Sequence, residues 1–184
     1  FNIKTMTNFK ELIQAADEIA EIAHHGQFRK DGRTPYIVHP RQAAALGEAI
    51  GLDGLAIAVL KVHDVVEDTN LSLDNVIDEL DKRGFNSSNY PVDTFREYLD
   101  ALTKRKAQGE RHLAYLLRLR CEGKTVSLMK LVDIVVNYFD TDDSMPKIRD
   151  KMELSYEIIN LLIGVDFSFM EAKYDHCIRG KSFI

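Results

Sequence analysis

The chain has 184 residues, of which 45% are hydrophobic and 29% are charged, and its formal net charge is −5. This length fits one compact domain, and the hydrophobic share is enough to bury a sizeable core, which argues against wholesale disorder. The mild acidity argues against a duplex-DNA-binding protein, which usually needs a basic face, but not against a small anionic ligand. We therefore predict a single domain over residues 1–184, without internal repeats or linkers.

Cellular location is indicated by segments that are missing from the sequence. No apolar stretch approaches the roughly 18–20 residues that span a membrane, and no charged-then-apolar leader begins the chain. Met6-Thr7-Asn8 resembles a natural start, which makes residues 1–5 a candidate cloning remnant. Cys121 and Cys177 have neither metal-binding spacing nor a disulfide framework around them. These features predict a cytoplasmic protein with free thiols and no membrane partner.

Apolar residues recur at steps of three and four along almost the whole chain, which is the pattern of amphipathic helices. The predicted helices, in chain order, cover residues 8–24, 40–50, 53–66, 72–84, 92–102, 110–120, 125–139, 147–163 and 167–177. Asn8 is the expected N-cap of the first, and Pro40 suits the first turn of the second. Strand-like alternation, a GxGxxG motif and a P-loop are absent. We therefore predict an all-α fold of about eight or nine helices.

The segment 63–69, with the sequence HDVVEDT, holds four ionisable side chains within six positions. On a continuous helix, His63 would face Glu67 and Asp64 would face Asp68. Like charges at this spacing destabilise a helix, whereas a divalent cation would turn the carboxylates into ligands. The alternative is a solvated acidic helix end with His63 packed in the core.

Two further residues fit a metal site. His39 stands at the entrance of a predicted helix, after a polar loop at 27–40 that can fold over a site. Asp133 lies within an apolar helical segment, where an unpaired carboxylate is costly. Lys130, three residues earlier, is the alternative partner of Asp133, and Asn137 shares its helix face. A metal site and a buried ion pair therefore both remain open.

The order of His39, His63-Asp64 and Asp133 resembles the H…HD…D signature of the HD-domain metal-dependent phosphohydrolases. The surrounding sequence is similar to the hydrolase domain of the Rel/SpoT alarmone enzymes, through AHHGQFRKDG at 23–32, PYIVHP at 35–40 and KLVD at 130–133. The resemblance covers roughly residues 8–140. It implies an all-α HD-domain helical bundle and a stand-alone hydrolase without the synthetase domain of the long enzymes.

The resemblance also implies roles for individual residues. The positions that match the family's metal ligands are His39, His63, Asp64 and Asp133. Mn²⁺ is the typical metal of the family, although such a mixed N/O set would also accept Fe²⁺ or Zn²⁺. Glu67 and Asp68 match the catalytic acidic pair, which orients or deprotonates the attacking water.

Four residues are candidates for binding the substrate. Arg29 and Lys30 match the family's basic pair, in which a guanidinium stacks on a base or binds phosphate and an ammonium binds phosphate. Asn137 matches a polar residue near the ribose and phosphates, and Lys104 is a further candidate for a phosphate contact. Tyr36 and the histidines at 24 and 25 are expected to serve packing and the helix end.

The sequence departs from the family pattern at two positions and in one segment. Lys61 stands one turn before Asp64, where it either faces solvent or modulates the site. Ile134 replaces the cation that usually follows the metal-binding aspartate. The segment from Met145 onward matches only loosely, so its role is left open.

The function implied by the resemblance is Mn²⁺-dependent hydrolysis of the 3′-pyrophosphate of guanosine, or adenosine, tetra- and pentaphosphate alarmones. The products would be pyrophosphate and GDP or GTP, or ADP or ATP. One alternative is a phosphatase acting on another nucleotide, such as NADPH or a nucleoside monophosphate. Another is a non-catalytic, metal-stabilised regulatory module that binds nucleotides, which the presence of Glu67 and Asp68 disfavours. The expected partner is a small nucleotide rather than a nucleic acid, with the base and the oligomeric state left open.

Overall fold

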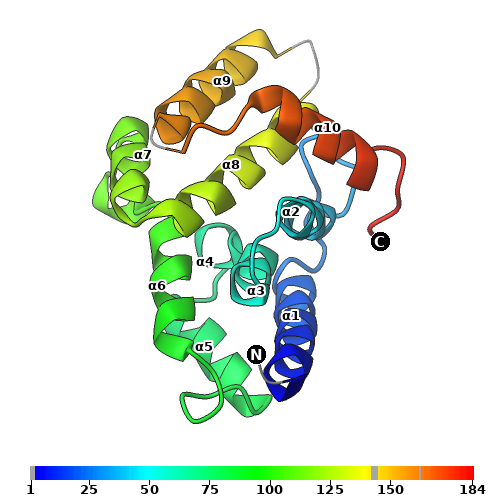
Figure 1. The fold of residues 1–184 in the computed structure, drawn as a ribbon, viewed down its shortest axis with the longest axis vertical. Helices are drawn as coiled ribbons and strands as arrows, with labels where there is room; N and C mark the ends of the chain where they lie inside the picture. The colour runs from blue at the N-terminus through cyan, green and yellow to red at the C-terminus, as the bar shows by residue number, and fades with distance from the viewer. Residues whose placement is uncertain (1–2, 142–144, 162) are drawn as a thin grey trace.

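The computed structural model describes residues 3–141, 145–161 and 163–184, with side chains from residue 9 onward. Within these ranges the chain forms α-helices, one 3₁₀ turn and no β-strand, so the predicted all-α class is confirmed (Figure 1). The elements are α1 (Ile3–Ala23), α2 (Val38–Ala49), α3 (Gly54–Val62), α4 (Val65–Asp68), α5 (Leu73–Lys82), α6 (Val92–Leu102), η1 (Lys106–Gln108), α7 (His112–Cys121), α8 (Lys124–Phe139), α9 (Pro146–Asn160) and α10 (Phe167–Cys177). Helix α4 is a single turn of four residues. Without it, the described residues form nine α-helices, which agrees with the expected number of eight or nine.

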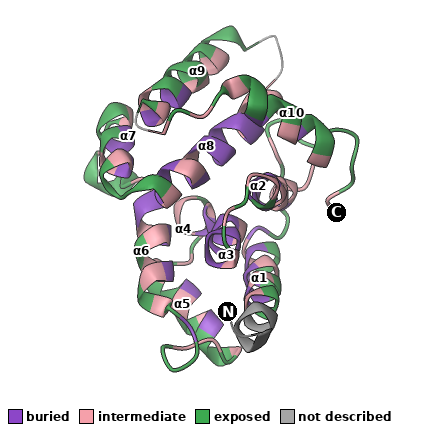
Figure 2. Cartoon of the chain, in the orientation of Figure 1, coloured by how far each residue is buried: buried purple, intermediate pink, exposed green. Residues whose placement is uncertain are grey.

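Helix α3 lies at the centre of the bundle, because it is apolar on every side. All its residues except Gly54 and Lys61 are buried. A helix with this composition must be surrounded by other elements, and α1, α2, α6 and α8 all pack against it. Figure 2 shows the buried colour concentrated on α3 and on the faces turned toward it. The two ends of α3 are therefore held at fixed positions inside the molecule.

The crossing of α2 and α3 is close because Gly47 has no side chain. A β-carbon at this position would lie 2.7 Å from Cδ1 of Leu60 and 3.1 Å from Cδ1 of Leu52. Leu60 is fully buried, so its side chain has little room to move aside. The same crossing brings His39 of α2 near His63, which follows α3, with 5.3 Å between the ring centroids.

The first two helices begin earlier than the sequence predicted. Helix α1 starts at Ile3, not at Asn8, because no proline or glycine precedes Asn8 to stop the helix. Residues 1–2 of the candidate cloning remnant lie outside the described residues. Helix α2 starts at Val38, which places Pro40 in the first turn, where its missing N–H is tolerated.

The predicted third helix was too long, because α3 ends at Val62 and a turn at His63 and Asp64 separates it from α4. The Nδ1–H of His63 donates a hydrogen bond to the carbonyl of Leu60 at 2.8 Å. A continued helix would use that carbonyl for the amide of Asp64, so the imidazole competes with the helix.

Within the described residues, no helix is both long and apolar enough to cross a bilayer. The outer helices instead show exposed faces, as on α5, α9 and α10 in Figure 2. Both cysteines are free thiols, Cys121 on the surface and Cys177 half-buried.

Lys61 faces away from the predicted metal ligands, toward α1. Its Nζ lies 2.8 Å from Oδ1 of Asp17, and the guanidinium of Arg41 lies 2.7 Å from Oδ2 of the same carboxylate. Arg41 also donates to the backbone carbonyl of Phe183 at 3.1 Å, which ties the last residues of the chain to α1 and α2. Lys61 therefore belongs to a structural ion network rather than to the site.

We expect Asp17→Asn to lower the free energy of unfolding by about 2 kcal/mol at neutral pH, because two half-buried cations lose their carboxylate. Burial alone would raise the pKa of Asp17, but its bonds to Arg41 and Lys61 outweigh burial and lower the pKa. The contribution is therefore complete above about pH 4, near the unfolded pKa, and is lost as the pH falls through the folded value. Urea unfolding of both proteins should show a difference that shrinks below about pH 4. A constant difference would contradict this account, and Asp78→Asn on the exposed face of α5 is the control.

Candidate active site

Three of the predicted metal ligands come together at the end of α3. The ligand atoms of His39, His63 and Asp64 all lie within 4.8 Å of one another. Nε2 of His39 is 3.4 Å from Oδ2 of Asp64, and Nε2 of His63 is 3.2 Å from Oδ1 of the same carboxylate. Both imidazoles are buried. The arrangement depends on the start of α2 and the turn after α3 meeting at one point.

The fourth predicted ligand, Asp133 of α8, adjoins this group. Its Oδ1 lies 3.0 Å from Nε2 of His39 and 3.4 Å from Nε2 of His63. Its Oδ2 lies 2.6 Å from Nζ of Lys130. Burial alone would raise the pKa of Asp133, but Lys130 and the two imidazoles keep it well below its usual range. The two interpretations of Asp133 are therefore compatible, because one oxygen serves the ion pair and the other faces the imidazoles.

The chemistry of this group fits a divalent metal ion. Because Nδ1–H of His63 donates to the carbonyl of Leu60, Nε2 is the nitrogen whose lone pair faces the carboxylates when the imidazole is neutral, as it is in a metal ligand. That nitrogen is buried and has no hydrogen-bond partner among the described residues. Burial alone would lower the pKa of His63, yet the carboxylates of Asp64 and Asp133 raise it to about 9. The site therefore favours a positive charge, and two imidazoles with two carboxylates suit a transition metal.

Tyr36 links the metal-ligand group to the predicted acidic pair, a role that the sequence analysis did not foresee. Its hydroxyl lies 2.9 Å from Oδ2 of Asp64 and 2.9 Å from Oδ2 of Asp68. A phenol has one proton, so it can donate to only one of these carboxylates at a time. His24, at the end of α1 as predicted, stacks on the Tyr36 ring with 4.4 Å between centroids. Gln27 donates to the backbone carbonyl of Asp68 at 3.0 Å and further fixes this end of α4.

The second member of the acidic pair, Glu67, is held by the segment that follows α6. Its Oε1 accepts the backbone amide of Lys104 at 2.7 Å, and its Oε2 lies 3.1 Å from Nζ of Lys106. The same ammonium group lies 3.0 Å from Oδ1 of Asp68. Lys106 thus bridges the two carboxylates, which otherwise repel each other. Lys106 ends the basic run at 104–106, but no motif in the sequence marks it as part of the site.

A basic cavity of about 310 Å³ opens beside Asp133, between α7, α8 and α9. Its lining includes Lys30, Lys130 and Lys151, and Asp133 is the one carboxylate among its lining residues in the described part of the chain. Burial and the charges of Lys151, Lys104 and Lys130 lower the pKa of the His112 imidazole at its wall to about 4. Burial and neighbouring lysines also lower the pKa of Lys151. Burial is the larger cause of both shifts, and the lysine charges add to it, so the cavity has a positive character that suits a phosphate group.

The loosely matching C-terminal segment supplies one wall of this cavity. Ile148, Lys151 and Ser155 of α9 line it, and Ser155 is hydrogen-bonded to His112 at 2.8 Å. Ile134, the residue in place of the usual cation, is a buried apolar part of the same lining. No motif marks Lys151 in the sequence, because only the packing of α9 on α8 brings it to the cavity.

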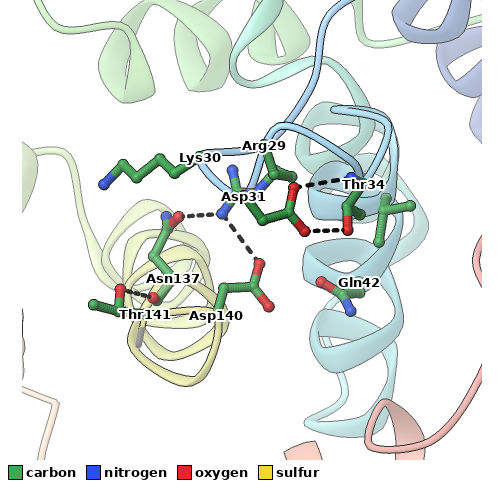
Figure 3. Close-up of a pocket in the computed structure, with 9 residues that line it drawn as sticks. Arg29, Lys30, Asp31, Thr34, Gln42, Asn137, Asp140 and Thr141 are labelled. Atoms are coloured by element: carbon green, nitrogen blue, oxygen red, sulfur yellow. Dashed lines mark hydrogen bonds and ion pairs between the residues drawn. The ribbon is translucent and has the colours of Figure 1, made fainter. Parts of the chain in front are cut away.

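A second hollow, of about 210 Å³, lies between the loop after α1, α2 and the C-terminal end of α8 (Figure 3). Arg29 donates from one nitrogen to Oδ1 of Asn137 at 2.9 Å and to Oδ2 of Asp140 at 3.1 Å. Its guanidinium also lies over the ring of Tyr36, 5.4 Å from the centroid. Lys30 and Asn137 line both this hollow and the basic cavity. The predicted substrate-binding residues Arg29, Lys30 and Asn137 are therefore neighbours.

Lys104 is placed differently from these three residues. Its backbone amide holds Glu67, and its side chain is not among the residues that line either hollow in the described part of the chain. Its charge still contributes to lowering the pKa of His112, which lines the basic cavity.

No family model matches the chain. Among curated proteins, it is 38% identical over 73 residues to the guanosine-3′,5′-bis(diphosphate) 3′-pyrophosphohydrolase of Borreliella burgdorferi, which covers 40% of this chain and 11% of that protein. It is 31% identical over 129 residues to the enzyme of the same name from Aquifex aeolicus, which covers 69% of this chain and 17% of that protein. The chain thus spans less than a fifth of the length of either relative.

Among solved structures, the fold matches that of a metazoan ortholog of SpoT, described as hydrolysing ppGpp and playing a role in starvation responses. The TM-score is 0.68 at 22% sequence identity, covering 94% of this chain and 97% of that one. This match shows the fold. Together with the curated relatives, it confirms the resemblance to the Rel/SpoT hydrolases indicated by the sequence.

We expect Mn²⁺ or Zn²⁺ to raise the melting temperature of the protein, because an ion that binds only the folded state stabilises it. At a hundredfold excess over Kd the gain is about 2.7 kcal/mol. Asp64→Ala and His63→Ala each remove a ligand and should abolish most of the shift, whereas Asp78→Asn should keep it. Thermal unfolding with and without the ion measures this, and a full shift in both ligand variants would place the metal elsewhere.

Proposed function

We propose that the chain is a metal-dependent phosphohydrolase that removes the 3′-pyrophosphate of guanosine alarmones such as ppGpp, and of their adenosine analogues. The observation that carries the proposal is the position of the buried ligand group between an acidic pair and a basic cavity. A nucleotide with phosphates in the basic cavity would bring a phosphorus atom close to both. The named activity of the matched relatives supports the same substrate class.

In this proposal, His39, His63, Asp64 and Asp133 hold a divalent ion, and Mn²⁺ is the ion we expect. When bound, such an ion supplies Lewis acidity toward a phosphoryl oxygen and activates water. Lys130 keeps Asp133 ionised by pairing with its outer oxygen at 2.6 Å. The Leu60 carbonyl keeps His63 in the tautomer whose Nε2 can bind a metal.

Glu67 and Asp68 would orient the attacking water and accept its proton. Water adds to the phosphorus attached to the ribose 3′-oxygen, the bond between that phosphorus and the 3′-oxygen breaks, and the 3′-oxygen takes up a proton. The products are pyrophosphate and a nucleotide with a free 3′-hydroxyl. Lys106, 3.0 Å from Asp68 and 3.1 Å from Glu67, would hold the two carboxylates at a fixed separation during this step.

The lysines of the basic cavity would neutralise the phosphates. Lys30 and Lys151 belong to its lining, and the charge of Lys104 acts on His112 in the same lining. Ammonium groups act as point charges for phosphate, and several of them in one cavity stabilise a highly charged group. Arg29 and Asn137, at the junction of the two hollows, would contact the base and the ribose.

With Mn²⁺, the purified protein should release pyrophosphate from ppGpp. Glu67→Gln and Asp68→Asn should each lower kcat by about 10²- to 10⁴-fold, the usual contribution of general acid–base catalysis, without changing the metal-induced thermal shift. Rates measured by a coupled pyrophosphate assay test this. Turnover at the wild-type rate in both variants would show that Glu67 and Asp68 do not take part in catalysis.

A panel of nucleotides separates this proposal from its alternatives. Release of orthophosphate from NADPH or a nucleoside monophosphate, with no pyrophosphate from ppGpp, would instead identify a phosphatase using the same residues. A metal-induced thermal shift without turnover of any nucleotide would identify a binding module.

Lys151→Ala is expected to raise KM for ppGpp by about tenfold with a smaller effect on kcat, because it removes a charge that binds phosphates distant from the reacting atom. Michaelis kinetics at several salt concentrations would also show a weaker salt dependence for the variant. An unchanged KM would mean that the phosphates do not occupy the basic cavity. Lys147→Ala, on the exposed part of α9, is the matched control.

A further inference from the structure

We propose that the outer face of α7, formed by Leu113, Ala114, Leu117 and Cys121, is the contact surface of a homodimer. In this dimer, α7 of one copy lies antiparallel to α7 of a second copy across a two-fold axis. The outer face contains none of the predicted site residues, so the inference stands apart from the proposed function.

Helix α7 is apolar on two opposite sides, but only one of them is covered by the rest of the chain. Tyr115, Leu116 and Leu119 are buried, because α7 packs against α6, α8 and α9. Leu113 and Leu117 point the other way, with exposed fractions of 54% and 46%. Figure 1 shows α7 at the margin of the bundle, and Figure 2 shows exposed residues on it. Since a helix that is apolar all round is normally buried, we expect a partner on its outer face.

The exposed apolar residues of α7 form one continuous face. Leu113, Leu117 and Cys121 are spaced four residues apart, so they follow one another along the helix, and the exposed Ala114 adjoins them. Single exposed leucines are ordinary on protein surfaces, whereas a contiguous apolar face is typical of an interaction site.

The charges at the two ends of α7 indicate that the partner is a second, antiparallel α7. Arg111 precedes the first turn and Glu122 follows the last, and both are exposed. Neither side chain has an ion pair or a hydrogen bond among the described residues. Each charge has the same sign as the nearby end of the helix dipole, which is unfavourable in a single chain. An antiparallel pair brings the Arg111 end of each helix beside the Glu122 end of the other, where both charges are compensated.

A two-fold axis at Leu117 gives this pair its register. Leu117 then faces Leu117 of the second copy, and Leu113 faces Cys121 of the second copy. The contact surface is identical on both chains, as in the commonest kind of homodimer. Two helix faces of this length cover less surface than a standard protein interface, so the dimer should be weak, with a Kd in roughly the micromolar range.

Sedimentation velocity of the full chain at concentrations from about 1 to 300 µM tests the association. The wild type should shift from monomer toward dimer over this range. Leu117→Glu places two carboxylates at the two-fold axis and should raise the dimer Kd at least about tenfold. Ile22→Glu, at a 68% exposed position on α1, is the matched control and should leave the Kd unchanged. A wild type that stays monomeric at every concentration, or a Leu117→Glu variant that dimerises like the wild type, would overturn the inference.

Charge reversal separates the dimer contact from the stability of the helix. Arg111→Glu and Glu122→Arg each improve the match with the helix dipole, so the melting temperature of the monomer should not fall. Each should nevertheless raise the dimer Kd by about threefold to tenfold, because like charges then meet across the two-fold axis. The double variant restores opposite charges and should return the Kd to near the wild-type value. No recovery in the double variant would contradict the antiparallel orientation.

Disulfide cross-linking in a Cys177→Ser background reads the orientation directly. With Leu117→Cys and Cys121→Ser, the new thiols face each other, and mild oxidation should give a covalent dimer. Leu113→Cys should also cross-link, through Cys121 of the second copy, and should no longer do so when Cys121 is changed to Ser. Cys121 alone should not cross-link, because its two copies lie about 12 Å apart along the helix axes, beyond the reach of a disulfide. Cross-linking through Cys121 alone, or at the control Ile22→Cys as fast as at Leu117→Cys, would overturn the proposed pairing.

Discussion

A carboxylate buried in the middle of an apolar helix needs polar partners for its charge, and Asp133 has such groups on both oxygens. Lys130 lies 2.6 Å from Oδ2, and the His39 imidazole lies 3.0 Å from Oδ1. Removing Lys130 would take away the ammonium that pairs with this buried carboxylate, and breaking a buried ion pair in this way is among the most costly changes in a protein interior. The packing of α2 and α3 against α8 therefore has an electrostatic requirement as well as an apolar one. That requirement brings the two imidazoles to one place.

Helix α8 organises the rest of the site along one stripe. Asp133, Asn137 and Asp140 are separated by four and three residues, so they follow one another along the same face of the helix. Asp133 adjoins the metal-ligand group, and Asn137 lines both hollows. Asp140 lines the second hollow but not the basic cavity. In the proposed function, a nucleotide lying along this stripe would meet the metal-ligand group first and the lysines of the basic cavity next.

Sequence reasoning was strongest where a residue's role depends on local pattern. The periodicity gave the helices, and the H…HD…D order named side chains that the fold brings together. It failed at His63 and Asp64, where a side chain takes a carbonyl from the helix, because periodicity does not register such competition. It also missed Lys151 and could not place Lys61. Both are single lysines on helices, and only tertiary packing decides whether such a side chain faces a phosphate cavity or Asp17.

Leu60 has two roles, one through its backbone carbonyl and one through its side chain. Its carbonyl fixes the tautomer of His63, and its side chain fills the space that Gly47 leaves open. A methyl group added at position 47 would press on the residue that orients His63, a predicted metal ligand, although it would not touch His63 itself. Packing at a residue two helical turns away from His39 therefore acts on the residue whose carbonyl orients the His63 imidazole.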